Sequence, residues 1–241
     1  MEDQFSRTRL LLGKDAMEKL KNARVAVFGI GGVGGYTVEA LARSGIGALD
    51  LIDNDTVNLS NLNRQIIATH STVGQYKVDA AAARVLDINP DIQVKTYRIF
   101  YLPETADRFD FTQYDYIVDA IDTVTGKLNL IVNAKAANVP IISSMGTGNK
   151  LDPTQFEVTD LAKTTMCPLA RIMRKECHKR GIDHVKVLYS REEALTPLDD
   201  DGNPLPPPEG SSRRSLPGST AFVPSVAGLI IAGEVIKDLI R

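Results

Sequence analysis

The chain has 241 residues, of which 43% are hydrophobic and 24% charged, so a hydrophobic core is expected and wholesale disorder is not. The net charge of −2 excludes an overall basic field for nucleic acid but leaves room for a local basic patch. The two cysteines, Cys167 and Cys177, form no C-x-x-C pair, which excludes a zinc site of four thiolates and argues against a disulfide framework. The N-terminus has no signal-like apolar region, and no apolar run is long enough to span a membrane. We therefore expect a cytoplasmic protein with reduced thiols.

The N-terminal segments alternate between helix and strand. Residues 8–22 carry apolar side chains at helical spacing, and residues 24–28 form a β-branched run that ends in glycines. A helix over 36–44 and a strand over 48–52 follow. This order of strand, glycine turn, helix and strand is typical of the first half of a dinucleotide-type fold.

The same alternation continues along the chain. We expect a helix over 77–88, strands over 93–97 and 116–121, a helix over 128–138 and a strand over 140–145. Strands that alternate with helices predict an α/β protein, with a Rossmann-like, mostly parallel sheet and helices on both faces.

The C-terminal part combines a long loop with a final helix. Residues 196–218 hold six of the twelve prolines and predict a mobile loop. Residues 226–240 predict a helix that packs on the sheet or forms a dimer surface. We find no internal repeat and expect residues 1–241 to form a single domain.

A glycine-rich turn follows the first predicted strand and opens the next helix. Its glycines are Gly29, Gly31, Gly32 and Gly34, in a G-x-G-x-x-G pattern. Residues without side chains let the backbone approach phosphate oxygens, and the helix N-terminus adds free N–H groups. Asp53 ends the second strand, 19 residues after Gly34, where a carboxylate can bind ribose hydroxyls. The pattern predicts a nucleotide site, and by itself it favours NAD.

Three further features favour ATP. Residues 53–65 supply amides and a guanidinium at one place, and Arg64 offers a planar donor fork suited to phosphate oxygens. Lys77 begins a helix, where its charge can meet phosphates, although a solvated helix face is the alternative. Asp122 follows the fourth strand at the carboxyl edge of the sheet, where a carboxylate with water and phosphate oxygens is typical of Mg²⁺. The alternative for Asp122 is a helix cap.

The glycine turn, the motif D-x-D-x-V-x-x-S-N-L-N-R-Q at 53–65, the later lysine and the strand ending D-A-I-D resemble the ubiquitin-activating-enzyme superfamily. This superfamily includes bacterial members for thiamin and molybdopterin synthesis, and the resemblance covers most of the chain. It implies an ATP-dependent enzyme that activates a carboxylate by adenylation.

The resemblance also implies the site residues. The ATP ligands are Gly29, Gly31, Gly32, Gly34, Asp53, Asp55, Asn61, Arg64, Gln65 and Lys77. Asp122 holds Mg²⁺. Arg7 resembles the arginine that reaches into the partner subunit's site, which implies a homodimer; Arg9 is the alternative. The implied catalytic residues are Arg64, Lys77, Asp122 and Arg7.

The branch of the superfamily follows from two observations. The activators of sulfur carriers usually have two C-x-x-C zinc pairs, which this chain lacks. Residues 152–164, 168–170 and 218–225 are instead similar to the tRNA threonylcarbamoyladenosine dehydratase family. That resemblance implies ATP-dependent cyclisation of threonylcarbamoyladenosine in tRNA, and it allows a cysteine desulfurase or other sulfur-acceptor partner.

The cysteines and histidines are assigned few functional roles. The ring closes within the substrate, so no protein nucleophile is required. Cys167, in a predicted loop and expected to be exposed, is the candidate for a thioester, whereas Cys177 is expected to be partly buried in a helix. The three histidines, His70, His178 and His184, have no metal-ligand spacing and are assigned no role.

A basic segment gives the tRNA partner local support. Residues 163–186 contain seven Lys or Arg and two acidic residues. The candidate tRNA contacts on a predicted helix are Arg171, Arg174, Lys175, Lys179 and Arg180. Arg213 and Arg214 in the proline-rich loop are further candidates. A solvated helix face is the alternative interpretation.

Two other functions stay open on the sequence. An adenylyltransferase for the C-terminus of a small sulfur-carrier protein would share every ATP residue. An NAD-binding redox protein would share the glycine turn, but it leaves Arg64, Lys77 and Asp122 unexplained.

Overall fold

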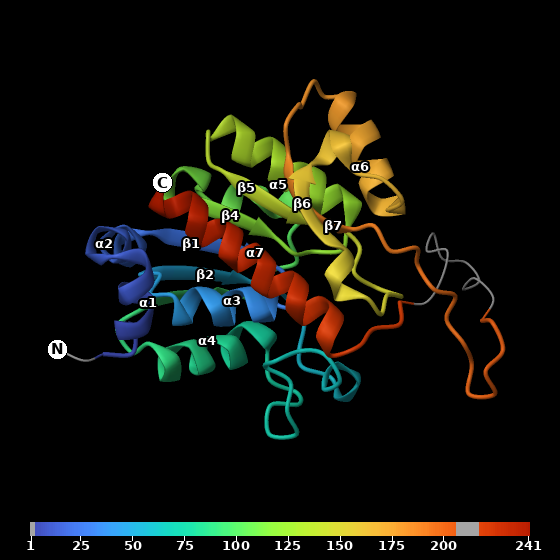
Figure 1. The fold of residues 1–241 in the computed structure, drawn as a ribbon, viewed down its shortest axis with the longest axis horizontal. Coiled ribbons are helices and arrows are strands. Elements are labelled where there is room, and N and C mark those ends of the chain that lie inside the picture. The colour runs from blue at the N-terminus through green and yellow to red at the C-terminus, as the bar shows by residue number, and fades with distance from the viewer. Residues whose placement is uncertain (1–2, 206–216) are drawn as a thin grey trace.

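The computed structural model describes residues 3–205 and 217–241, arranged around one seven-stranded sheet (Figure 1). The strand order is β3-β2-β1-β4-β5-β7-β6. All neighbouring strands pair in parallel except β6, which runs antiparallel to β7 at one edge. The strands are β1 (Arg24–Phe28), β2 (Ala48–Ile52), β3 (Gln93–Tyr97), β4 (Tyr116–Asp119), β5 (Ile141–Ser144), β6 (Phe156–Asp160) and β7 (Lys186–Ser190).

Helices cover both faces of this sheet. The α-helices are α1 (Ser6–Leu12), α2 (Lys14–Asn22), α3 (Gly34–Arg43), α4 (Lys77–Ile88), α5 (Val124–Ala136), α6 (Pro168–His178) and α7 (Phe222–Ile240). Short 3-10 helices are η1 (Leu59–Asn61), η2 (Pro103–Arg108), η3 (Phe111–Gln113), η4 (Pro153–Gln155) and η5 (Leu161–Lys163). Helices α3, α4 and α7 lie on one face, and α5 and α6 lie on the other (Figure 1). The Rossmann-like fold class predicted from the sequence is confirmed.

The central strands are apolar on both faces because both faces are covered. In β1, Val25 and Val27 belong to the hydrophobic cluster under α3, α4 and α7. Ala26 and Phe28 point the other way, into the cluster under α5 and α6. The near-continuous apolar run of this strand therefore fills two cores.

Helix α7 packs closely on α3. A Cβ atom on Gly228 would lie 2.3 Å from the carbonyl oxygen of Val33 and 3.0 Å from the amide nitrogen of Thr37. The Thr37 hydroxyl donates a hydrogen bond of 3.1 Å to the Gly228 carbonyl. Glycine at this position lets the two helix backbones meet.

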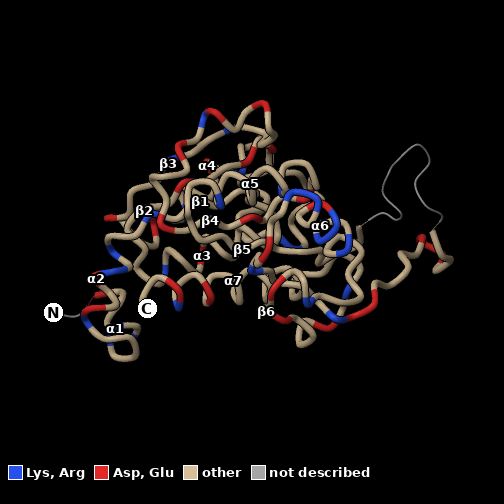
Figure 2. Tube along the Cα trace, turned by 90° about the horizontal axis from the view of Figure 1, so that it is seen from above, with Lys and Arg blue, Asp and Glu red and all other residues tan. Residues whose placement is uncertain are grey.

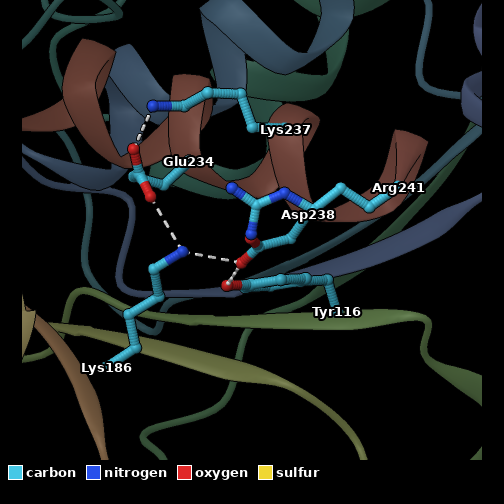
Figure 3. A network of polar contacts seen from close by, with 6 residues as sticks. All are labelled: Tyr116, Lys186, Glu234, Lys237, Asp238 and Arg241. Atoms are coloured by element: carbon cyan, nitrogen blue, oxygen red, sulfur yellow. Dashed lines mark hydrogen bonds and ion pairs between the residues drawn. The ribbon is translucent and has the colours of Figure 1, made fainter.

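Polar contacts fix the C-terminal half of α7 over the sheet (Figure 3). Asp238 accepts hydrogen bonds from the Tyr116 hydroxyl of β4 at 2.7 Å and from the Lys186 ammonium of β7 at 2.8 Å. Lys186 also contacts Glu234 at 2.8 Å. Burial, followed by the hydrogen bond to Asp238, raises the pKa of Tyr116, so this hydroxyl stays protonated and donates.

An ion pair joins α3 to α4. Glu39 accepts from the Arg84 guanidinium at 2.6 and 3.0 Å and from Arg43 at 2.8 Å. Burial by itself would raise the pKa of Glu39, but the two arginines outweigh it and hold the pKa below its ordinary value of 4.5.

Several predicted elements needed correction. The helical stretch at 8–22 is two helices, because Gly13 adopts φ +83° between them. The sequence prediction lacks the strands β6 and β7, although Val187, Leu188 and Tyr189 of β7 form a short apolar run. The predicted strands and helices elsewhere are present, with ends shifted by a few residues; α7 begins at Phe222 rather than at 226.

The expected exposure of Cys167 was wrong. This residue is 5% exposed and is the N-cap residue before α6, where its sulfur accepts a hydrogen bond of 3.5 Å from the Ala170 amide. Cys177 is also buried, at 2% exposure rather than partly. Both thiols pack in the core under α5 and α6.

The described parts of the predicted proline-rich loop are residues 196–205 and 217–218. In the first of them the regular feature is a single bridge between Leu198 and Pro204. Arg213 and Arg214 lie outside the described residues. Among the residues that are described, none of the helices has the length and apolar character needed to cross a membrane.

Candidate active site

A cavity of about 660 Å³ opens at the carboxyl ends of β1, β2, β4 and β5. In the strand order, β2 and β3 lie on one side of β1 and β4 lies on the other, so the order of the strands reverses at β1. The cavity lies at this point, where open α/β sheets bind ligands. Its walls come from the glycine turn, the loop after β2, η1, the start of α4 and the loops after β3, β4 and β5. Residues 217–219, Leu169 and Pro224 close its sides.

The glycines of the turn play different parts. Gly29 has φ +90°, and a Cβ there would lie 2.6 Å from the Ala120 carbonyl oxygen. A Cβ on Gly34 would lie 1.8 Å from the Gly29 carbonyl oxygen, so Gly34 closes the turn from behind and does not line the cavity. Gly31 and Gly32 do line it, and on Gly31 the nearest atom to an added Cβ is the Gln65 amide nitrogen at 3.9 Å. The cavity side of the turn is therefore open to a ligand.

The last helix supplies part of this wall. A Cβ on Gly32 would lie 3.1 Å from the Pro224 Cβ in the first turn of α7. Pro224 also lines the cavity. The glycine turn is thus held between β4 on one side and α7 on the other.

Asp53 is fixed by the turn that it faces. One carboxylate oxygen accepts from the Ile30 amide at 2.7 Å, and the other accepts from the Asp55 amide at 2.8 Å. Burial raises the pKa of Asp53, although Lys77 and these amides oppose the change. The carboxylate is held at the floor of the cavity with lone pairs left over for ribose hydroxyls.

Lys77 is the best-buried cation of the cavity. Its side chain is 8% exposed, and its ammonium contacts the Asp55 carboxylate at 2.7 Å, while Asp55 is 57% exposed. Lys77 is the first residue of α4, where a positive charge is unfavourable for the helix dipole. Its position is therefore explained by the cavity, where it can meet an anionic ligand, and not by the helix.

Residues of the S-N-L-N-R-Q segment form the opposite wall. Asn61 accepts from the Asn58 amide at 3.0 Å, which fixes η1. Arg64 donates to the Ser60 carbonyl at 2.8 Å and lines the cavity. Gln65 is 6% exposed, and its carbonyl oxygen has no hydrogen-bond donor among the described residues. A buried acceptor in this state needs a partner, which a hydroxyl or amine of a ligand would supply.

Asp122 is exposed at the rim of the cavity, in the loop between β4 and α5. Helix α5 takes Thr123 as its N-cap residue, so Asp122 lies one position before the cap. The part of the chain that is described has no cluster of three metal-ligating side chains. A metal here would have one carboxylate and the oxygens of phosphates and water, the arrangement that suits Mg²⁺.

A buried polar network under the cavity was missed in the sequence. Lys127 and Asp119 are both fully buried and lie 3.0 Å apart. The Lys127 ammonium also donates to the Ser144 carbonyl at 2.7 Å, and the Ser143 hydroxyl donates to Asp119. The sequence does carry a signal: Lys127 directly precedes the apolar residues Leu128, Leu130 and Ile131 in a helix that packs on the sheet.

Other predicted residues lie elsewhere. Arg7 is exposed on α1 and lies outside the cavity. Helix α1 lies near the end of the sheet where β1 begins (Figure 1). Arg9 pairs with Asp3 at 2.5 Å. The candidate tRNA contacts also lie outside the cavity, on α6 or directly after it (Figure 2). Leu169 of α6 does line the cavity, so this helix extends from the site to the basic surface.

The fold and this cavity define a nucleotide-binding α/β protein. Residues 5–241 match the model of the ThiF family, and the chain belongs to that family. It is 45% identical to the tRNA threonylcarbamoyladenosine dehydratase of Bacillus subtilis (strain 168), over 100% of this chain and 96% of the relative. The Escherichia coli (strain K12) relative of the same name is 38% identical over 82% of this chain and 76% of its own length.

A solved structure gives the same result. The structure of E. coli tRNA N6-threonylcarbamoyladenosine dehydratase in complex with ATP superposes with a TM-score of 0.86 at 34% identity, covering 98% of this chain and 93% of that one. The sequence-based family prediction is therefore confirmed, and the NAD-binding and sulfur-carrier alternatives are not favoured.

Proposed function

We propose that this protein dehydrates threonylcarbamoyladenosine in tRNA, using ATP to activate the carboxylate of the modified nucleoside. The observation that supports this most is the convergence of the glycine turn, Asp53, Arg64, Lys77 and Asp122 on one cavity. Relatives that match 100% and 82% of this chain carry this activity in their names.

The reaction overcomes the poor electrophilicity of a carboxylate. The nucleoside carboxylate attacks the α-phosphate of ATP and forms an acyl-adenylate, with loss of pyrophosphate. The neighbouring carbamoyl group then attacks the acyl carbon, the ring closes, and AMP leaves. The nucleoside loses one water in total, and the oxygen of that water, which comes from the carboxylate, leaves with AMP.

The protein's own residues position the reactants and offset phosphate charge. The Asp53 carboxylate accepts from the ribose. The backbone of Gly29, Gly31 and Gly32 approaches the phosphates, and Arg64 and Lys77 donate to their oxygens. In this proposal the remaining nucleotide contacts come from Gly34, Asp55, Asn61 and Gln65, with Gly34 acting through the turn and Asp55 through Lys77. Arg64, Lys77, Asp122 and Arg7 are the catalytic set.

Lys77 is held ready for this task by Asp55. The pair leaves the ammonium at the cavity wall, and the exposed Asp55 carboxylate can turn to solvent when phosphate oxygens take its place. Asp122 would hold Mg²⁺, which neutralises phosphate charge when bound.

Several partners complete the proposal. Arg7 of a second copy would reach the cavity, so the active species is a homodimer. The exposed leucines Leu10 and Leu11, each 85% exposed on α1, support a contact at this helix. We also propose a cytoplasmic location and, as the family resemblance allows, a cysteine desulfurase or sulfur-acceptor partner. That residues 1–241 act as one ATP-binding unit stays a prediction.

Mass spectrometry of nucleosides tests the activity. The protein is incubated with Mg-ATP and tRNA that carries threonylcarbamoyladenosine, and the digested tRNA is examined for the dehydrated nucleoside. We expect a product that requires ATP and disappears in the Asp122→Ala variant. No product, together with ATP–pyrophosphate exchange that starts only when a sulfur-carrier protein is added, would refute the dehydratase and favour the adenylyltransferase.

A further inference from the structure

A second cavity lies beside the C-terminal half of α6. It has a volume of about 610 Å³ and is formed by η5, α6 and the loop that leads into β7. Its floor is apolar, since Leu161, Cys177 and Val185 line it and each is at most 3% exposed. We call this cavity the α6 groove.

Planar polar side chains surround this floor. Arg174, His178 and His184 all line the α6 groove. Arg174 donates to the Thr164 carbonyl at 2.7 Å, which fixes its guanidinium plane. His184 contacts Asp160 at 3.1 Å and is 90% exposed. Histidine rings and arginine planes are groups on which proteins stack unpaired bases of RNA.

The lining of the groove balances Asp160 and Asp183 against Arg174 and Lys175, whereas the surface beside it on and directly after α6 is positive. Lys179 and Arg180 share one partner, Glu176, so their combined charge is only partly offset. Arg171 and Lys175 are exposed and form no ion pair with any described residue. Figure 2 shows basic residues gathered along α6. The phosphates of an RNA strand complement these positive charges better than a protein segment with few acidic residues would.

Helix α6 connects the groove to the candidate active site. Leu169, near its start, lines the ATP cavity, whereas Lys175 and His178 line the groove. Six to nine residues separate these positions in one helix, which corresponds to roughly 9–14 Å along its axis. One single-stranded segment can therefore present one base to the ATP cavity and another to the groove.

We infer that the α6 groove seats an unstacked base of the substrate tRNA, next to the modified nucleoside, while Arg171 and Lys175 bind the phosphates beside it. This inference rests on the proposed function, because it takes the RNA substrate from there. It adds a second subsite that sets which RNA segment reaches the ATP cavity.

The first test fills the groove. Ala162 is exposed and lines it, so Ala162→Trp blocks the space without touching the core. Ala83 is exposed on α4, at the other face of the sheet, and Ala83→Trp is the matched control. With tRNA that carries threonylcarbamoyladenosine as the probe, we expect Ala162→Trp to raise the Kd about tenfold, the loss of one stacked base. Ala83→Trp should leave the Kd unchanged, and both variants should keep the stabilisation by Mg-ATP against thermal unfolding.

The second test separates base from phosphate contacts. The double variant Arg171→Ala/Lys175→Ala should lower the slope of log Kd against log salt by about 1.4, since each single-strand phosphate contact contributes about 0.7. Ala162→Trp should weaken binding with the slope unchanged. An unchanged Kd in Ala162→Trp, or equal losses in the two tryptophan variants, would overturn the base subsite. A groove used by a protein partner would give the first of these results.

The outcomes distinguish this inference from the function on which it rests. A wild-type protein that forms the dehydrated nucleoside, with an unaffected Ala162→Trp variant, would overturn the groove alone. A wild-type protein that binds this tRNA but forms no product would overturn the dehydratase, and the binding data would still decide the groove.

Discussion

Replacing Lys127 by methionine removes the cation from a fully buried polar network and keeps most of the side-chain volume. The variant leaves the Asp119 carboxylate with Ser143 but without its ion-pair partner, and it leaves the Ser144 carbonyl without its donor. Both charged side chains are 0% exposed, so solvent does not replace the lost contacts.

The expected cost is large. Breaking a buried ion pair by removing one partner costs about 3–5 kcal/mol, because an uncompensated charge stays in the core. For a chain of this size that corresponds to a decrease of roughly 6–20 °C in Tm. Replacing both charges avoids the unpaired carboxylate, so the double variant Asp119→Asn/Lys127→Met should recover more than half of the loss.

Urea unfolding of the wild type, the two single variants and the double variant measures these terms. The midpoint and the slope are both recorded, so that a change in the unfolded state is recognised. Two results would refute this reasoning. One is a loss of unfolding free energy below about 1 kcal/mol in Lys127→Met, and the other is a double variant less stable than Lys127→Met. Either result would mean that the unpaired Asp119 carboxylate is not the source of the instability.

Three further predictions follow from other parts of the molecule. Lys77→Met should lower kcat/KM for ATP by about 10²–10³, as for the loss of one preorganised donor, and should leave Tm nearly unchanged; wild-type kinetics would remove Lys77 from the site. Gly228→Ala should lower the free energy of unfolding by about 1–3 kcal/mol, because the added Cβ overpacks against α3. Gly233→Ala in the same helix has no atom within 4 Å of the added Cβ and should raise it by about 0.5–1 kcal/mol. Equal effects of the two substitutions would contradict the close packing at Gly228. Because the pKa of Glu39 is lowered, its contribution to stability is present above the ordinary value of 4.5 and is lost as pH falls through the folded-state pKa. In urea titrations from pH 6 to pH 3, Glu39→Gln should therefore lose less stability than the wild type, and parallel curves would exclude this linkage.

The sequence predicted those parts of the fold whose signals are local. The run at 24–28 and the glycines after it specify a buried strand and a turn, and the structure has both. By contrast, β6 pairs with β7 as an antiparallel edge strand, and its residues are all half-buried. This strand has no continuous apolar run, and Phe156 and Val158 are its two apolar residues, in an alternating pattern too short to distinguish a strand from a loop.

The candidate site was predicted in the same uneven way. The motif at 53–65 contributes side chains to the floor and to one wall of the cavity, because they are close in the sequence. The partnership of Lys127 with Asp119 depends on how α5 lies against two strands, which no local pattern encodes. The burial of Cys167 likewise follows from the docking of α6, so a residue expected in a loop became part of the core.

The contact between Pro224 and the glycine turn has a consequence for biosynthesis. A chain that ends before Phe222 contains the nucleotide motifs but lacks one wall of the cavity and the helix that holds the turn in place. Ribosome-bound chains of that length should therefore bind ATP poorly. Nucleotide affinity would thus be acquired only once α7 has been made, after the glycine turn, Arg64 and Lys77.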